Sequence, residues 1–411
     1  MTKEERKKII GARQQKAQQN DKLKHKPTNA VFNVTDDCNN YCVYCFTEQN
    51  PHYMTLDTAK SAVDYLANNI QEQNKAEGRI TFFGGEPLLC WDSIIVPVVN
   101  YAEQTYPKMF TFSITTNGIL LTYKRLLWMK EHSIYPHFSM DGAKQTQDMN
   151  RPCKDGTSSF EKLQSIIPMM IKLFPDVTFR ATITPQSAPF LFDNFTYALK
   201  MGFSNCFFTP NVRENWTSED KMILFEQLAM IYKFYENLFK DNKELPIDFL
   251  QISDAIKENT QYEKKIFYSR SAHHCGMGED CVGIGYDGSI YGCQEQATRG
   301  KKSKFYLGNI KTGYKRGRHI NLVNRFINSS SIVTCETPSL CVDCPRKEIC
   351  KNKSCPSTNM DLFGNLYTHA NMDCSWKLMN FYLARNLIEN MKDNDSDSFV
   401  KYFNKIIERR M

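Results

Sequence analysis

The sequence predicts an α/β fold built on a parallel sheet, followed by a smaller cysteine-rich domain. Apolar, strand-like runs alternate six times with helix-like segments between residues 30 and 209. Such alternation is typical of parallel strands joined by right-handed helical crossovers. Nine of the 15 cysteines lie between residues 275 and 374, and all of these except Cys335 form a separate group. A chain of 411 residues is long enough to hold two or three domains.

The individual elements are predicted from hydrophobic periodicity and segment length. Pro136 lies in the fourth predicted strand and has no backbone N–H, so we expect weaker pairing there. The predicted strands cover residues 30–35, 80–83, 110–115, 134–139, 177–183 and 206–209. The predicted helices cover residues 56–70, 92–105, 123–131, 159–174, 190–200 and 218–243. In the last helix, an apolar stripe is expected to pack into the core through Met222, Phe225, Leu228, Ala229, Ile231 and Phe234.

Three closely spaced cysteines, Cys38, Cys42 and Cys45, follow the first predicted strand. Their C-x3-C-x2-C spacing can hold three irons of a 4Fe–4S cluster and leaves the fourth iron without a protein ligand. A cluster held by four cysteines mainly transfers electrons, whereas an open iron can bind a substrate. A zinc site, or thiols without a shared ligand, are the alternatives that the spacing alone leaves open.

Three polar or glycine-rich motifs end the next three predicted strands. They are Gly84-Gly85-Glu86-Pro87, Thr115-Thr116-Asn117-Gly118 and Ser139-Met140-Asp141-Gly142. Arg151 follows Ser139 by twelve residues. Ligands of parallel α/β sheets and barrels bind at the carboxyl ends of the strands, so these motifs are expected to meet at one ligand site. Taken singly, a strand-ending Gly-Gly or Asp-Gly is commonly only a turn.

In this order the motifs resemble the radical S-adenosylmethionine (SAM) enzymes, from about residue 30 to residue 212. The resemblance implies a six-stranded partial (β/α)6 barrel, open on one side. It implies that Cys38, Cys42 and Cys45 are catalytic and bind a 4Fe–4S cluster, to whose open iron SAM binds. One electron would then break the sulfur–C5′ bond of SAM, and the 5′-deoxyadenosyl radical would abstract hydrogen from a substrate.

The same resemblance assigns roles in SAM binding. Glu86 would complement the SAM ammonium, Arg151 would suit its carboxylate, and Tyr44 would lie where the backbone meets the adenine. Arg180 and Thr182 are weaker candidates. The full set of predicted SAM contacts is Tyr44, Gly84, Gly85, Glu86, Asn117, Ser139, Asp141 and Arg151.

The late cysteines resemble a SPASM domain, an extension that carries two auxiliary 4Fe–4S clusters. A G-x4-C element lies at Gly288–Cys293, with a predicted hairpin turn at Asp287-Gly288. A C-x2-C-x5-C-x4-C run follows it. The last gap of this run has four residues here, whereas SPASM domains usually have three. By this resemblance, auxiliary cluster I is held by Cys275, Cys281, Cys293 and Cys355. Auxiliary cluster II is held by Cys341, Cys344, Cys350 and Cys374. Two zinc sites of four thiolates each are the alternative.

Composition limits the location and partners of the chain. No apolar run approaches the length of a membrane span, and residues 1–26 lack the apolar core of a signal peptide. We therefore expect a cytoplasmic protein without a membrane partner, in which cysteines bind metal rather than pair as disulfides. No RNA-binding motif is evident, so no nucleic-acid partner is expected.

Positive charge is concentrated in two segments of the chain. Residues 1–26 hold nine Lys/Arg against three Asp/Glu, and residues 299–318 hold eight Lys/Arg and no acid. Such segments are commonly only solvated. The more specific prediction is that they bind an acidic peptide partner. Its acidic recognition segment would be held partly by Lys301, Lys302, Lys304, Lys315, Arg316 and Arg318.

The predicted domain organisation has five parts. We expect a basic arm (1–29), a radical SAM partial barrel (30–212), a helical linker (213–272), a SPASM domain with a β-hairpin and short helices (273–376) and a C-terminal helical segment (377–411). Twenty-nine residues before the first strand are too few for the winged-helix leader-binding domain that is often fused in front of such enzymes.

Full auxiliary ligation resembles two groups of SPASM enzymes. One forms thioether or carbon–carbon crosslinks, or epimers, in ribosomally made precursor peptides (RiPPs). The other oxidises a Cys or Ser of a sulfatase to formylglycine and carries an Asp after the third auxiliary cysteine. Gln294 and then Glu295 follow Cys293 here, which favours a peptide maturase that receives electrons from a flavodoxin or ferredoxin. An iron–sulfur electron carrier without catalysis is the alternative from another class.

Overall fold

A computed structural model describes residues 26–49, 51–263, 278, 281–297, 303–314, 334–342, 344–346, 355–366, 368–392 and 396–408. The basic arm up to residue 25, Cys275, Cys350 and most of the predicted basic contacts (Lys301, Lys302, Lys315, Arg316 and Arg318) lie outside the described residues. Within the described part, no helix is both long and apolar enough to cross a lipid bilayer.

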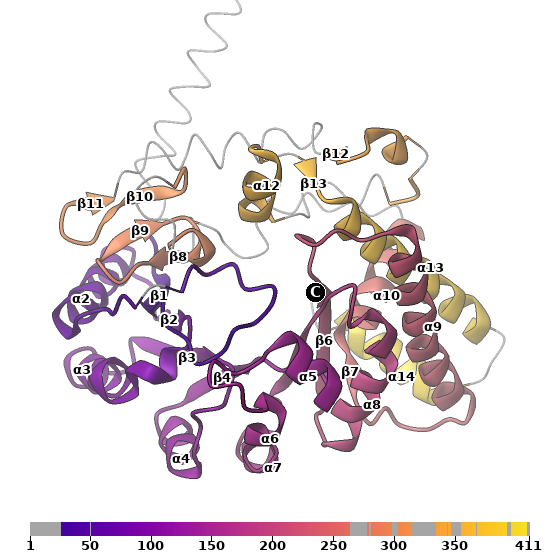
Figure 1. Ribbon diagram of the computed structural model, residues 1–411, viewed down its shortest axis with the longest axis horizontal. Helices are drawn as coiled ribbons and strands as arrows, with labels where there is room; N and C mark the ends of the chain where they lie inside the picture. The colour runs from indigo at the N-terminus through magenta and orange to yellow at the C-terminus, as the bar shows by residue number, and fades with distance from the viewer. Residues whose placement is uncertain are drawn as a thin grey trace, which may run out of the picture.

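The parallel strands β1 to β7 form an open, curved wall with helices on its outer side (Figure 1). Strands β1 to β4 pair in sequence order, and β5, β6 and β7 form a second parallel group. A single parallel bridge between Ser139 and Arg180 joins β4 to β5. The strands are β1 (Asn29–Thr35), β2 (Gly78–Gly84), β3 (Phe110–Thr116), β4 (Ile134–Phe138), β5 (Thr178–Ile183), β6 (Asn205–Pro210) and β7 (Asp248–Phe249). The predicted α/β class and all six predicted strands are confirmed.

Pro136 pairs with Ile114 of β3, so the fourth strand keeps its ladder on that side. On its other side, β4 reaches β5 only through the Ser139 bridge. A strand with a partner on one side tolerates proline. The missing N–H has no energetic cost on the side where no partner strand would accept its hydrogen bond.

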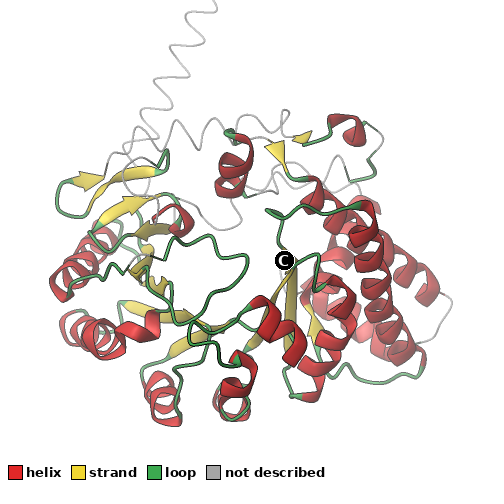
Figure 2. Cartoon of the chain, in the orientation of Figure 1, coloured by secondary structure: helices red, strands yellow, loops and turns green. Residues whose placement is uncertain are grey.

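The helices of the barrel cover its convex side (Figure 2). They are α2 (Leu56–Glu72), α3 (Val96–Thr105), α4 (Tyr123–Glu131), α5 (Lys144–Asn150), α6 (Ser159–Leu163), α7 (Ile166–Leu173) and α8 (Leu191–Lys200). One predicted helix, 159–174, is divided into α6 and α7. Pro168 explains the division, because proline cannot donate to the carbonyl four residues earlier and its ring clashes with that turn.

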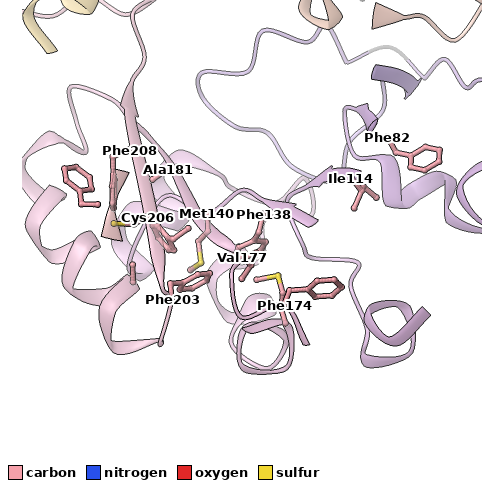
Figure 3. Close-up of a cluster of buried hydrophobic side chains, with 14 of the residues drawn as sticks. Phe82, Ile114, Phe138, Met140, Phe174, Val177, Ala181, Phe203, Cys206 and Phe208 are labelled. Carbon is pink, nitrogen blue, oxygen red and sulfur yellow. The ribbon is translucent and has the colours of Figure 1, made fainter. Parts of the chain in front are cut away.

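Side chains alternate between the two faces of the barrel strands. In β2, Ile80 and Phe82 are buried against the helices, whereas Arg79 and Thr81 face the concave side. The outer face packs into one continuous core that includes Phe82, Ile114, Phe138, Ala181 and Phe208 (Figure 3). The concave face therefore carries polar side chains such as Arg79 and Thr81 beside the apolar Phe83.

After the barrel, α9 (Ser218–Lys240) and α10 (Leu250–Glu263) pack beside β6 and against α13 (Asn371–Lys392). Thr217 begins α9 with a capping box completed by Asp220. The predicted apolar stripe of α9 is only partly correct. Leu228 and Ile231 are fully buried, but Met222 is 62% exposed and Phe225 39% exposed. The predicted stripe is rotated away from the core at its start, because the buried face of α9 consists of Leu224, Leu228, Ile231, Tyr235 and Phe239.

The cysteine-rich region is joined directly to the barrel sheet. Strand β8 (Cys281–Ile284) pairs in parallel with β1, and Asn29 lies opposite Cys281. Strand β9 (Ser289–Tyr291) returns antiparallel to β8, and β10 (Tyr306–Asn309) and β11 (Gly313–Tyr314) complete an eight-stranded sheet. The predicted hairpin is confirmed, with Gly288 at a φ of +78° in the turn.

The remaining elements lie across the open side of the barrel or behind it (Figure 1). The parallel pair β12 (Thr334–Cys335) and β13 (Thr368–His369) lies near the helix α12 (Pro356–Phe363). Helix α14 (Asp397–Glu408) packs on α10.

Candidate functional site

The loop that carries the first three cysteines is anchored to a segment more than a hundred residues later. The N–H of Tyr41 donates to the carbonyl of Pro152 (2.8 Å), and that of Val43 donates to Asn150 (3.0 Å). Asn40 forms an antiparallel bridge with Cys153. These backbone bonds fix the loop over the carboxyl ends of the strands, where the strand-end motifs also lie.

Cys38, Cys42 and Cys45 lie on this loop with increasing exposure along it: Cys38 is buried and Cys45 is exposed. Burial raises the pKa of Cys38 to about 12. Within the described residues, no three Cys, His, Asp or Glu side chains converge as they would on one metal ion. The three thiols fit a 4Fe–4S cluster, in which each thiolate binds a different iron.

Gly84 and Gly85 allow β2 to approach the start of the cysteine loop. The N–H of Gly85 donates to Thr35 (2.8 Å), and that of Glu86 donates to Asp37 (2.8 Å). A Cβ on Gly85 would lie 2.1 Å from the Asp37 carbonyl oxygen, and one on Gly84 would lie 2.1 Å from that of Thr35. No other residue type fits this approach, so the two glycines set the distance between the motif and the cysteines.

Glu86 is fully buried and joins two of the strand-end motifs. Its carboxylate accepts from the Leu88 N–H (3.0 Å), the Thr116 hydroxyl (2.8 Å) and the Asn117 N–H (2.8 Å). Burial raises the pKa of this carboxyl to about 7, although these hydrogen bonds oppose the shift. The carboxylate thus holds the Thr116-Asn117 turn against β2. Its predicted contact with the SAM ammonium stays a prediction.

Asn117 reaches the first cysteine. Its side-chain Nδ2 donates to Asn39 Oδ1 at 2.7 Å and lies 3.8 Å from the Sγ of Cys38. The Asn117 side chain is uncharged, and its hydrogen bond to Asn39 orients the cysteine loop. The structure therefore places Glu86, Asn117 and Cys38 in one connected series.

Asp141, Tyr44 and Arg151 form a second buried group. The Tyr44 hydroxyl donates to Asp141 Oδ2 (2.6 Å), and Arg151 Nε lies 3.0 Å from Asp141 Oδ1. The guanidinium carbon of Arg151 lies 5.4 Å from the centre of the Tyr44 ring. The N–H of Thr182 also donates to Asp141 (2.9 Å). Asp141 thus ties the cysteine loop to β5, and the predicted SAM contacts of these residues stay predictions.

Ser139 is half-buried at the end of β4, between Thr116 of the second motif and Arg180 of β5. Its N–H donates to the Thr116 carbonyl (3.0 Å). The predicted SAM-contact residues therefore meet at one edge of the sheet, as expected from their positions at strand ends.

Six of the eight late cysteines are described. Cys281 begins β8, Cys293 follows β9, and Cys355 precedes α12. Cys341 ends the short 3-10 helix Pro338–Cys341, Cys344 follows it, and Cys374 lies in α13. With Cys275 and Cys350 outside the described residues, the division of these cysteines into two clusters stays a prediction.

Arg213, which follows β6, is a functional candidate that the sequence did not reveal. It donates to Glu295 (3.0 Å) and to Asp361 of α12 (2.9 Å), and its Nη2 lies 3.4 Å from the Thr358 hydroxyl. Gln296 also donates to Asp361 (3.0 Å). This Arg213 network joins the barrel to the segments that follow Cys293 and Cys355. Its partners are too distant in the sequence for any local pattern to pair them.

Residues 32–187 match the model of the radical SAM superfamily. These residues therefore form a radical SAM domain. The chain is 24% identical over 335 residues to the radical SAM cyclopropyl synthase TigE of Paramaledivibacter caminithermalis, a match that spans 75% of this enzyme and 65% of TigE. It is also 24% identical over 335 residues to a cysteine-type anaerobic sulfatase-maturating enzyme of Clostridium perfringens, across 77% of this enzyme and 86% of that protein.

Solved structures share the fold of this radical SAM enzyme. The enzyme anSMEcpe with bound AdoMet and the Cp18Cys peptide superposes with a TM-score of 0.68 at 19% identity, covering 89% of this chain and 98% of that one. Streptococcus suis SuiB bound to its precursor peptide SuiA gives a TM-score of 0.53 at 14% identity, covering 88% and 79%. The shared fold extends beyond the barrel, since most of both chains is covered.

Proposed function

We propose that this radical SAM enzyme uses SAM to modify a ribosomally made precursor peptide. The radical SAM match of residues 32–187 and the C-x3-C-x2-C spacing of Cys38, Cys42 and Cys45 carry the proposal. When bound, the cluster would supply the electron that breaks the sulfur–C5′ bond of SAM, and the resulting 5′-deoxyadenosyl radical would take a hydrogen atom from the peptide. The proposed products are thioether or carbon–carbon crosslinks, or an epimer.

The protein residues have separate proposed roles at this site. The three cysteines hold three irons, and Asn117 orients their loop from the Cys38 side. Gly84 and Gly85 hold β2 close to the start of the cysteine loop, because a Cβ at either position would meet the Thr35 or Asp37 carbonyl oxygen, and this close approach would place their backbone beside the SAM amino group. Ser139 offers a hydroxyl at the end of β4, and Asp141 holds Tyr44 and Arg151 beside the loop.

We further propose that the late cysteines form a SPASM domain with two auxiliary clusters, within the five-part division that the sequence predicts. Cys281 and Cys293 lie on one hairpin, and Cys355 begins the helix that the Arg213 network ties to that hairpin. This connection supports the prediction that Cys355 joins Cys281 and Cys293 in one cluster. The proposed location is cytoplasmic, with flavodoxin or ferredoxin as the electron donor.

Formylglycine formation is a second candidate function, since the relatives include sulfatase-maturating enzymes at the same identity as TigE. The surroundings of Cys293 favour the first candidate. Gln294 follows it, and the Gln294 carbonyl accepts from Asn33 of β1 (3.1 Å). The next residue, Glu295, is engaged by Arg213 and by the Ser357 hydroxyl (3.2 Å). A carboxylate held in this way is poorly suited to remove a proton from a substrate.

An electron carrier without catalysis does not account for the match of residues 32–187 to the radical SAM superfamily. Replacing Cys38, Cys42 and Cys45 together with Ala tests the catalytic proposal. We expect the variant to lose production of 5′-deoxyadenosine from SAM with dithionite. Cys206→Ala is the matched control, since Cys206 is buried in the core away from the loop and should leave SAM cleavage intact. Continued SAM cleavage by the triple variant would contradict the site.

The product distinguishes the two peptide functions. Small peptides encoded beside the gene are incubated with the reconstituted enzyme, SAM and reductant, and the products are treated with an aldehyde-selective hydrazide. A crosslink or epimer without hydrazide capture supports the maturase. Hydrazide capture at a single Cys or Ser would instead establish formylglycine formation.

A further inference from the structure

Cys38 differs from the other two cysteines of the loop in its surroundings. Cys38 is buried, whereas Cys42 is partly buried and Cys45 is exposed. Two nitrogen atoms lie close to the Sγ of Cys38: the backbone N of Asn40 at 3.4 Å and the side-chain Nδ2 of Asn117 at 3.8 Å. Hydrogen bonds to sulfur are longer than those to oxygen, because the sulfur atom is larger. Cys38 therefore accepts from two N–H groups that come from different parts of the chain.

The Asn117 side chain is held so that it presents an N–H to Cys38. The N–H of Ile119 donates to Asn117 Oδ1 (3.0 Å), which identifies the other end of the amide as the donor. One of the two hydrogens on Asn117 Nδ2 is directed to Asn39 Oδ1 (2.7 Å), which leaves the second for the sulfur. The backbone N–H of Asn117 donates to the buried carboxylate of Glu86 (2.8 Å). Bonds on three sides thus fix the orientation of the donor.

The second donor, the backbone N–H of Asn40, is fixed as firmly. Asn40 is fully buried. Its Nδ2 donates to the Arg151 carbonyl (3.3 Å), and its carbonyl accepts from Gln49 Nε2 (2.8 Å). An antiparallel bridge to Cys153 adds a further anchor. Donors that are held in this way already point at the sulfur, so they stabilise added negative charge there without first having to turn.

We propose that Asn117 raises the reduction potential of the 4Fe–4S cluster through its N–H···S hydrogen bond to Cys38. This inference rests on the proposed cluster site. Reduction takes one electron from the flavodoxin or ferredoxin, transfers no proton and increases the negative charge on the iron and sulfur atoms. Hydrogen bonds to the sulfurs stabilise this charge and so favour the reduced form. In this role Asn117 acts through Cys38 and is a positioning residue.

A purely structural role for Asn117 would act through a different atom. Orienting the loop requires the hydrogen bond from Asn117 to Asn39 Oδ1, whereas changing the potential requires only the N–H that faces Cys38. Asn39 Oδ1 also lies 3.8 Å from Cys38 Sγ, where its partial negative charge opposes reduction. Removing the Asn117 amide should therefore lower the reduction potential, whereas removing the Asn39 amide should leave the potential unchanged or raise it.

A redox titration of the reconstituted enzyme without SAM, followed by EPR, tests the proposal. The signal of this cluster is the one that the Cys38/Cys42/Cys45 triple alanine variant loses. Asn117→Leu removes the N–H at similar volume, and its ratio of oxidised to reduced cluster at a fixed potential should rise about tenfold, which is about 59 mV for one electron. Asn117→Asp, which places a negative charge there, should raise the ratio further. Asn39→Ala is the matched control and should not raise it.

The outcomes separate this role from the other proposals. An unchanged ratio in Asn117→Leu, with the cluster retained, would overturn the proposal. Equal increases in Asn117→Leu and Asn39→Ala would also overturn it, since Asn117 would then act only by orienting the loop. A triple alanine variant that loses no EPR signal would refute the cluster site and this proposal with it. A lower potential in Asn117→Leu, with no peptide modified by the wild type, would reject the peptide function and leave the role of Asn117 standing.

A second measurement does not require an Asn117 variant that folds. The wild type and Asn39→Ala are labelled with ¹⁵N in the asparagine side-chain amides, reconstituted and reduced without SAM. Pulsed EPR should detect a ¹⁵N nucleus coupled to this cluster in both proteins, because the Asn117 amide contacts Cys38 in each. Absence of the coupling in the wild type would overturn the proposal. Its loss in Asn39→Ala would assign the contact to Asn39 and would overturn the proposal as well.

Discussion

Removing the Arg213 side chain should loosen the cysteine-rich region from the barrel. Arg213 contacts Asp361, whose side chain is 8% exposed, and Glu295, which is 24% exposed. A charge-assisted hydrogen bond to the buried Asp361 contributes about 2 kcal/mol. The more exposed pair with Glu295 contributes about 0–1 kcal/mol. We therefore expect Arg213→Ala to lower the free energy of local opening by about 2–3 kcal/mol.

Hydrogen–deuterium exchange measures this opening directly. Amides of residues 293–297 and of α12 should exchange about 30- to 150-fold faster in Arg213→Ala, because each 1.36 kcal/mol is a factor of ten. The exchange rates of Arg213→Lys should lie between those of the wild type and Arg213→Ala, since a lysine ammonium cannot bridge both carboxylates as the guanidinium fork does. Arg385→Ala is the matched control, because its pair with Glu389 is 48% exposed on both sides and should change exchange about twofold at most. Equal exchange in wild type and Arg213→Ala would refute the role of the network.

Three further predictions follow from the site. Gly85→Ala should lower the free energy of unfolding by at least about 3 kcal/mol, because its Cβ would meet the Asp37 carbonyl oxygen at 2.1 Å. Gly156→Ala, at a φ of +74° with open space around it, should lower it by about 1–2 kcal/mol. Equal losses in thermal unfolding would contradict the close approach at Gly85. The unfolded state binds a proton at His137 near pH 6.5 and the folded state only near pH 4, so stability should fall by up to about 3 kcal/mol as the pH is lowered between these values. His137→Gln should flatten this part of the stability curve in pH-dependent urea unfolding, and an unchanged slope would refute the assignment. Anaerobic reconstitution should give about twelve irons per chain, and about eight in the Cys38/Cys42/Cys45 triple variant; four irons with stoichiometric zinc would exclude the auxiliary clusters.

The barrel was predictable because its signals are local. Each predicted strand is a short apolar run, and each motif directly follows one, so the meeting of Glu86, Asn117 and Cys38 follows from topology alone. The break between α6 and α7 was also readable, since Pro168 is visible in the sequence.

The parts that were missed depend on distant partners. Arg213 forms hydrogen bonds with residues 82 and 148 positions away. The sequence around an arginine that follows a strand carries no local pattern that identifies such partners. The exposed Met222 and Phe225 show the limit of apolar spacing, because two neighbouring stripes of α9 fit it and tertiary packing selects the other. Strand β8 has only four residues and no alternation, so its pairing with β1 gave no signal.

The pairing of β8 with β1 has a consequence for synthesis and truncation. The first strand of the barrel must wait for a partner about 250 residues later, so during translation its free edge stays open long after the other barrel strands can form. A fragment that ends before residue 273 would keep that edge permanently unpaired, and an unpaired edge invites pairing with another chain. The cysteine-rich region therefore also guards the barrel against self-association, and separating the two parts should yield an aggregation-prone barrel rather than a simpler enzyme.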